Sequence, residues 1–152
     1  MCDYSLHGLE NRLAKEAEVL MVHRFFSGSK GLISLDNPKP VVPQTGFRNT
    51  VRRIFGWKPY PQPVAVCIPD GACLLMTDIP WGFCQEHKLD SEEDVMFRQM
   101  SANDYEYRDA VEFKSGLKVR LQELETGQKL TVLSLSGEET EMEYLNSEVH
   151  SA

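Results

Sequence analysis

The residue whose chemistry stands out in this sequence is Cys2, which directly follows the initiator methionine. The initiator methionine is normally removed when residue 2 is small, and Cys2 would then carry a free α-amino group. The pKa of such an amine lies near neutrality, at about 7.7–8.0, so the amine can act as the base for the thiol of its own residue. One interpretation of this start is therefore an enzyme with an N-terminal cysteine nucleophile.

Cysteine and histidine together also suggest a metal site. Zinc prefers about four cysteine or histidine ligands in a tetrahedron, and structural zinc sites usually contain paired Cys-x-x-Cys motifs. The 4 cysteines of this chain form no such motif. Burial in the core is the competing explanation for each of them, because free cysteine is among the most buried residue types. The residues that could serve as ligands are Cys2, His7, His23, Cys67, Cys73, Cys84 and His87.

Two pairs of these residues are close enough in the sequence for their geometry to be predicted. A hairpin that turns about Asp70 would place Cys67 and Cys73 opposite each other, with Cβ atoms about 4.5–5.5 Å apart. That separation suits a shared metal ion and approaches disulfide geometry. A helix over 81–89 would place Cys84 and His87 on one face, because residues three apart are neighbours on a helix.

The elements that must position these residues are mainly strands. Alternating or continuous apolar runs, separated by Gly, Pro and Asp turns, are typical of a β protein. About eight short strands with one short helix predict a small barrel or sandwich. The segment before Val19 is expected to be a short helix or an irregular arm, and Asp78 is a candidate cap for the later helix. The expected strands are 19–26, 32–35, 64–68, 72–76, 94–100, 109–113, 117–124 and 130–135, and the expected helix is 81–89.

The chain length of 152 residues fits one domain, expected here over 1–136. Within it, 36–63 is predicted to be a long proline-rich loop, because most of the 8 prolines fall there or shortly after it. The acidic remainder, 137–152, lacks periodicity and is predicted to be a disordered tail. Aromatic and basic residues make 46–60 a candidate contact surface for a protein partner.

Charge and hydropathy exclude several classes of function. The net charge of −7 makes nucleic acid an improbable partner, since phosphate binding needs a basic surface. No apolar run reaches the roughly 18 residues of a membrane span, and no secretory signal is present. A cytoplasmic location follows by elimination, and cysteines there are expected to be thiols or metal ligands.

Several short motifs resemble those of a group of uncharacterised bacterial proteins that open with Met-Cys-Asp-Tyr-Ser. The shared stretches are Met1-Cys2-Asp3-Tyr4-Ser5-Leu6, Asn11-Arg12-Leu13-Ala14, Val22-His23-Arg24-Phe25, Gly28-Ser29, Gly31-Leu32, Ala65-Val66-Cys67-Ile68-Pro69 and Gly71-Ala72. The resemblance implies no activity, but it favours Cys2, His23 and Cys67 as a set. The Met-Cys start is also similar to that of N-terminal nucleophile amidotransferases, over two residues only.

The leading hypothesis from the sequence is a Cys/His metal-binding or thiol-dependent protein, with Cys2, His23 and Cys67 as the ligands of a transition metal such as zinc. The thiolates and the neutral imidazole are the forms that would bind the metal. Two alternatives remain open. One is a non-catalytic interaction module that uses 46–60, and the other is an enzyme with Cys2 as its nucleophile.

Overall fold

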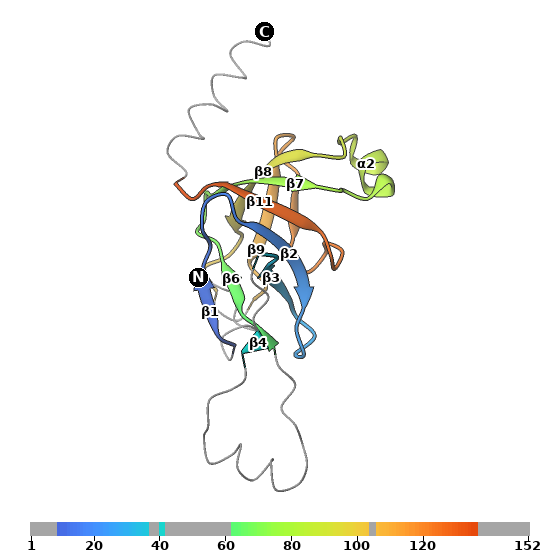
Figure 1. The fold of residues 1–152 in the computed structure, drawn as a ribbon. Coiled ribbons are helices and arrows are strands. Elements are labelled where there is room, and N and C mark those ends of the chain that lie inside the picture. The colour runs from blue at the N-terminus through green and yellow to red at the C-terminus, as the bar shows by residue number, and fades with distance from the viewer. Residues whose placement is uncertain (1–8, 37–39, 42–61, 104–105, 137–152) are drawn as a thin grey trace, which may run out of the picture.

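The computed structural model describes residues 9–36, 40–41, 62–103 and 106–136, and strands dominate these ranges (Figure 1). Nine strands form one sheet in the order β1-β6-β3-β2-β11-β7-β8-β9-β10. Neighbouring strands are antiparallel except for β1 and β6, which are parallel. The strands of this sheet are β1 (Asn11–Leu13), β2 (Val19–Arg24), β3 (Lys30–Ser34), β6 (Ala65–Cys67), β7 (Cys73–Thr77), β8 (Glu93–Gln99), β9 (Asp109–Phe113), β10 (Lys118–Arg120) and β11 (Lys129–Ser134).

The main core lies between the two halves of this sheet. One half contributes Leu20 and Val22, and the other contributes Leu74 and Phe97, all at most 1% exposed. Because both halves present apolar residues to one cluster, the architecture is sandwich-like. The prediction of a mainly β fold is confirmed. The sheet is not closed into a barrel, since β1 and β10 are its two edges.

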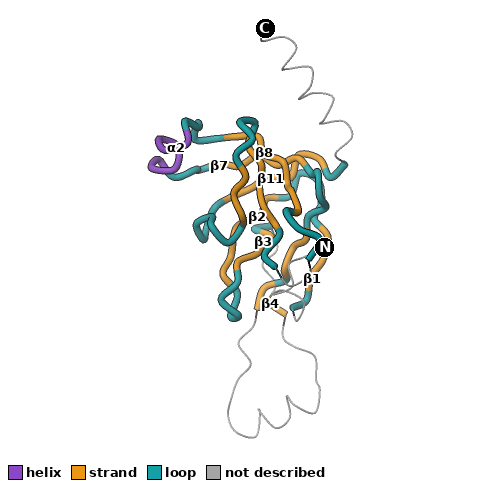
Figure 2. The backbone as a smooth tube through the Cα atoms, turned by 180° about the vertical axis from the view of Figure 1, so that it is seen from behind, coloured by secondary structure: helices purple, strands orange, loops and turns teal. Residues whose placement is uncertain are grey.

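The helix α2 (Trp81–His87) is the one helix of the described ranges, and Figure 2 shows it at the side of the molecule away from β1 and β4. It lies within the expected range 81–89. The expected cap is wrong, because Pro80 is the N-cap residue and makes no side-chain cap bond. Asp78 instead has a positive φ of 55° and pairs with Lys129, with 3.0 Å between its Oδ2 and the lysine Nζ.

The predicted hairpin around Asp70 is also wrong in its pairing. The turn itself forms, since the Ala72 N–H donates to the Pro69 carbonyl at 3.3 Å. The two strands then separate, because β6 pairs with β1 and β3 whereas β7 pairs with β11 and β8. Both runs are apolar on both faces, so their pattern did not specify which neighbours would pair with them.

The expected helix or irregular arm before Val19 is replaced by β1 and a turn. The backbone of β1 pairs in parallel with β6, in the register Arg12 to Val66, and the Ala14 N–H donates to the Cys67 carbonyl at 2.9 Å. This short strand exists because a distant segment supplies its hydrogen-bond partners, which a local helix propensity does not anticipate.

The ends of the proline-rich segment form a second, two-stranded sheet. Strand β4 (Pro40–Val41) pairs antiparallel with β5 (Gln62–Pro63). The segment was expected to be a loop throughout, so this ladder is a correction. Residues 42–61, which include the 46–60 surface, lie outside the described ranges, as does the acidic tail 137–152.

Candidate functional site

The sheet half that carries β1, β6, β3 and β2 has a second apolar face, opposite the main core. Side chains alternate along a strand, so Leu20 and Val22 face the main core while Met21 faces the other side. The buried members of this second face are Phe25, Ile33, Ala65 and Cys67, with Leu9 and Met21 packed against them. Two faces of one half-sheet are therefore buried, and Cys67, one of the candidate ligands, is buried on the second.

His23 and Cys67 lie in one row across this second face. His23 pairs with Gly31, and Leu32 pairs with Val66. Continuing the antiparallel register of β3 and β6 by one residue places Gly31 beside Cys67. The row therefore runs Cys67, Gly31, His23. Because Gly31 has no side chain, nothing on the middle strand stands between the imidazole and the sulfur.

The environment of His23 is partly apolar. Its ring meets the ring of Phe25 edge to face, with 5.1 Å between the centroids. Burial lowers the pKa of the imidazole, because the charged form loses hydration. The His23 ring therefore lies against Phe25, on the face of the sheet that also carries Cys67.

The state of the sulfurs differs among the described cysteines. Cys67 is 6% exposed and its sulfur is part of a disulfide bond. Cys73 and Cys84 are reduced thiols. Cys2 and His7 belong to residues 1–8, which lie outside the described ranges. Cys67 is therefore the described cysteine that is chemically engaged.

The other candidate ligands are not brought to this row. Three strands, β3, β2 and β11, separate Cys67 from Cys73, so the predicted opposition of these two residues is wrong. The Cys84 thiol is buried and donates to the carbonyl oxygens of Ile79 and Asp90. His87 stacks at a tilt on Phe83, with centroids 4.5 Å apart. These thiols and this imidazole are accounted for by packing and hydrogen bonding in their own surroundings.

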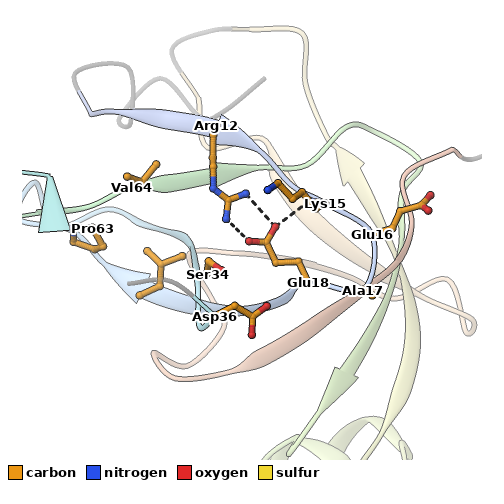
Figure 3. A pocket seen from close by; sticks show the side chains of 10 residues that line it. Arg12, Lys15, Glu16, Ala17, Glu18, Ser34, Asp36, Pro63 and Val64 are labelled. Carbon is orange, nitrogen blue, oxygen red and sulfur yellow. Dashed lines mark hydrogen bonds and ion pairs between the residues drawn. The ribbon is translucent and has the colours of Figure 1, made fainter. Parts of the chain in front are cut away.

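A hollow of about 490 Å³ lies where β1, β3 and β5 meet (Figure 3). An ion pair at its wall joins Arg12 of β1 to Glu18, the residue before β2. Arg12 Nη1 donates to Glu18 Oε2 at 3.1 Å, Nη2 donates to Oε1, and the Lys15 N–H donates to Oε2 at 2.9 Å. The hollow is lined by Arg12, Lys15, Glu16, Ala17, Glu18, Ile33, Ser34, Asp36, Pro63 and Val64.

Glu18 is 7% exposed, and its surroundings stabilise the charged form. The hydrogen bonds from Arg12 are the largest cause that lowers its pKa to about 2, while burial opposes them. The hydrogen bond from the Lys15 N–H lowers the pKa further. A carboxylate with so low a pKa stays ionised near neutral pH and is a weak base, so we interpret the pair as a structural clamp on β1.

Sequence reasoning missed both the clamp and the role of Gly31. Arg12 and Glu18 fall in the stretch interpreted as a helix or an arm, where their spacing of six residues has no special meaning. Gly31 lies outside the expected strands 19–26 and 32–35, whereas it pairs with His23 inside a ladder. The available signal was the opposite charges of Arg12 and Glu18 in one short stretch, but the sharp turn between them, where Ala17 has a positive φ of 63°, is seen only in the structure.

Comparisons with known proteins leave the site to be argued from its own residues. No protein family, no curated protein and no solved structure matches the chain. In the described ranges, no group of three or more His, Cys, Asp or Glu side chains is arranged to hold a metal ion. No helix there has the length and hydropathy that a membrane span requires. His23 and Cys67 would thus need a further ligand from residues beyond those ranges.

Proposed function

We propose that the protein, with its thiols reduced, binds a transition metal such as zinc through Cys67, His23 and Cys2. The observation that supports this most is the row Cys67, Gly31, His23 on one sheet face. Thiolate sulfur and imidazole nitrogen are the ligands that zinc prefers, and Gly31, the residue between them on the middle strand, adds no side chain of its own. Cys2 supplies the second thiolate in this proposal, and water can complete the tetrahedron.

The spacing of the row is compatible with a bridging ion. Neighbouring strands are about 4.7–4.9 Å apart, so the Cα atoms of His23 and Cys67 lie about 10 Å apart. A zinc ion between the two side chains would make bonds of about 2.3 Å to the sulfur of Cys67 and about 2.0–2.1 Å to a ring nitrogen of His23. An ion above Gly31 is thus within reach of both residues when each side chain leans toward the middle strand.

Zinc binding would depend on the protonation of the cysteine ligands, and therefore on pH, in a defined direction. Each cysteine must lose its proton to ligate, so zinc uptake releases protons and weakens as the pH falls. The hypothesis of an N-terminal nucleophile makes the opposite demand, because it needs Cys2 unligated and reactive. The two functions are therefore separated by whether zinc suppresses the reaction of Cys2 with a thiol reagent.

Zinc content should depend on Cys67 and not on Cys73. The full chain, purified under reducing and anaerobic conditions without a histidine tag, is expected to hold one zinc ion per chain by elemental analysis. Cys67→Ser should lose it, because a hydroxyl is a poor zinc ligand. Cys73→Ser is the matched control, since Cys73 is equally buried at 6% exposure but lies on another strand. Equal loss in both variants, or zinc-free parent protein, contradicts the proposal.

A second candidate function is a protein-interaction module that uses 46–60. The observation that favours it is the β4–β5 ladder, which holds Val41 beside Gln62. The chain between these residues therefore leaves and rejoins the described structure at one place. A segment whose two ends are held side by side in this way can present a binding sequence without disturbing the strands.

Deleting Gly46 to Lys58 tests the module. The deletion should preserve the far-ultraviolet circular dichroism of the parent, because the described strands do not depend on those residues for their sheet pairing. Partners that co-purify with the parent and withstand a salt wash should be lost from the variant. Retention of the same partners by the deletion variant rejects the module.

A further inference from the structure

We infer that the hollow where β1, β3 and β5 meet binds a small zwitterion of the amino-acid class through Lys15, Asp36 and Ser34. The volume of the hollow, about 490 Å³, lies within the roughly 300–1,000 Å³ that is typical of small-molecule sites. Its lining combines charged, polar and apolar side chains. Neither His23 nor Cys67 belongs to that lining, so the inference does not depend on the proposed metal site.

Two of the charged side chains around the hollow satisfy each other. Arg12 and Glu18 form the ion pair described above, so their charges cancel. Three of the five N–H donors of the Arg12 guanidinium are used, one on the Leu13 carbonyl and two on the Glu18 carboxylate. The guanidinium thus keeps two N–H groups that can donate to the carboxylate of a ligand.

Lys15 and Asp36 are the charges of the lining that remain for a ligand. Both are exposed, and neither forms an ion pair with another residue of the described ranges. Glu16 is turned elsewhere, since its Oε1 accepts a hydrogen bond of 3.4 Å from the Leu135 N–H, and Figure 3 shows it directed away from the other lining side chains. The hollow therefore offers one ammonium group and one carboxylate, which complement the two charges of a zwitterion.

Ser34 adds a buried polar group to the lining. Its side chain is 5% exposed, and its hydroxyl has no hydrogen-bond partner within the part of the chain that the structure describes. A buried hydroxyl without a partner costs free energy, and a bound ligand can supply the missing hydrogen bond. In the view of Figure 3, Ser34 lies between Arg12 and Asp36. A ligand that reaches from one of these residues to the other would pass this hydroxyl.

An apolar wall gives the ligand its orientation. Ile33, Pro63 and Val64 line the hollow, and Figure 3 shows Pro63 and Val64 on the side away from Glu18. An aliphatic group placed against this wall would bury apolar surface. The site therefore suits a ligand that joins an aliphatic side chain to its two charged groups.

An α-amino acid with a branched aliphatic side chain carries all of these groups. Its carboxylate would pair with the Lys15 ammonium group and accept from the remaining N–H groups of Arg12. Its own ammonium group would pair with the Asp36 carboxylate. Charge-assisted hydrogen bonds of this kind are stronger than those between neutral groups, so both charges should contribute to affinity.

Titration of the full chain with L-leucine tests the site. The amide signals of Ala17 and Ser34 in the nuclear magnetic resonance spectrum should shift and saturate, and calorimetry gives the dissociation constant. Leucinamide lacks the carboxylate and isocaproate lacks the ammonium group, so each should bind at least about tenfold more weakly, as for the loss of one hydrogen bond to a charged group. The other standard α-amino acids are titrated in the same way. Binding by none of them, or equal binding by leucine and its two analogues, overturns the inference.

Two variants assign the charges, and both replace exposed side chains, so the circular dichroism of the parent should be kept. Asp36→Asn should weaken leucine binding at least about tenfold but leave isocaproate binding unchanged, because isocaproate has no ammonium group. Lys15→Met should weaken the binding of leucine and isocaproate but not that of leucinamide. Glu16→Gln is the matched control and should bind leucine as the parent does. Unchanged leucine affinity in Asp36→Asn and Lys15→Met, or equal loss in all three variants, rejects the site. The titrations use metal-free protein, so their outcome is independent of zinc binding.

Discussion

Glu18→Gln is expected to lower the free energy of unfolding by about 3 kcal/mol at neutral pH, the lower end of the range for breaking a buried ion pair. The lower end applies because Arg12 is about one-third exposed while Glu18 is 7% exposed. Glutamine keeps the size of the side chain but removes the charge that faces the guanidinium. Urea denaturation followed by circular dichroism measures the change.

The pH dependence gives this prediction its second readout. The pKa of Glu18 is lowered from 4.5 to about 2 in the folded chain. A depressed carboxylate pKa adds stability that is complete above the unfolded value and is lost as the pH falls through the folded value. The difference between the parent and Glu18→Gln should therefore be full above about pH 5 and shrink between pH 4.5 and 2.

Glu16→Gln is the matched control, because Glu16 lines the same hollow but is exposed. Its change in stability should stay within about 0.5 kcal/mol, as for surface substitutions generally. If both variants lose the same stability, or if the Glu18 variant shows no pH dependence in this window, the clamp does not hold β1 in the way described.

His23→Phe should weaken zinc binding by more than the roughly 10–100-fold that the loss of an outer-shell partner costs, because it removes a direct ligand. Phenylalanine can keep the edge-to-face contact with Phe25, which has a centroid distance of 5.1 Å. The fold should therefore survive, with an unfolding free energy close to that of the parent. Competition with a chromophoric chelator on the reduced chain measures the affinity.

Met21→Leu controls for packing on the same face, since Met21 is on β2 with His23 and contacts the same apolar cluster. It should bind zinc as the parent does. Unchanged zinc affinity in His23→Phe would remove His23 from the site and leave the two thiols as the candidates. A difference in unfolding free energy between the two variants, measured by urea denaturation, would distinguish an effect on packing from the loss of a ligand.

Local sequence pattern determined much of the secondary structure. The run 109–113 was expected as a strand and forms β9 with the same bounds, and β10 lies inside the expected strand 117–124, although it is shorter. The helix α2 also falls inside its expected range. These elements are local, so alternation, turn residues and propensity within a few positions were enough to identify them.

The sequence analysis also named Cys2, His23 and Cys67 as a set of candidate ligands before any geometry was known. What it could not determine was their distance, because that depends on β3 lying between β2 and β6. The middle strand places Gly31 in the row, and no property of the segments around residues 23 and 67 anticipates it. Cys67 and Cys73, six residues apart, were instead expected to be neighbours.

Only the tertiary structure decided which strands pair and which charged side chains form an ion pair. β1 exists because β6 supplies its hydrogen-bond partners from more than fifty residues away, and Arg12 meets Glu18 because the turn before β2 brings them together. Periodicity tells which face of a strand is buried, but the choice of neighbour depends on packing across the whole sheet. Cys2 was singled out by its place in the sequence, and its proposed role now depends on Cys67, a residue that the fold places on the same face as His23.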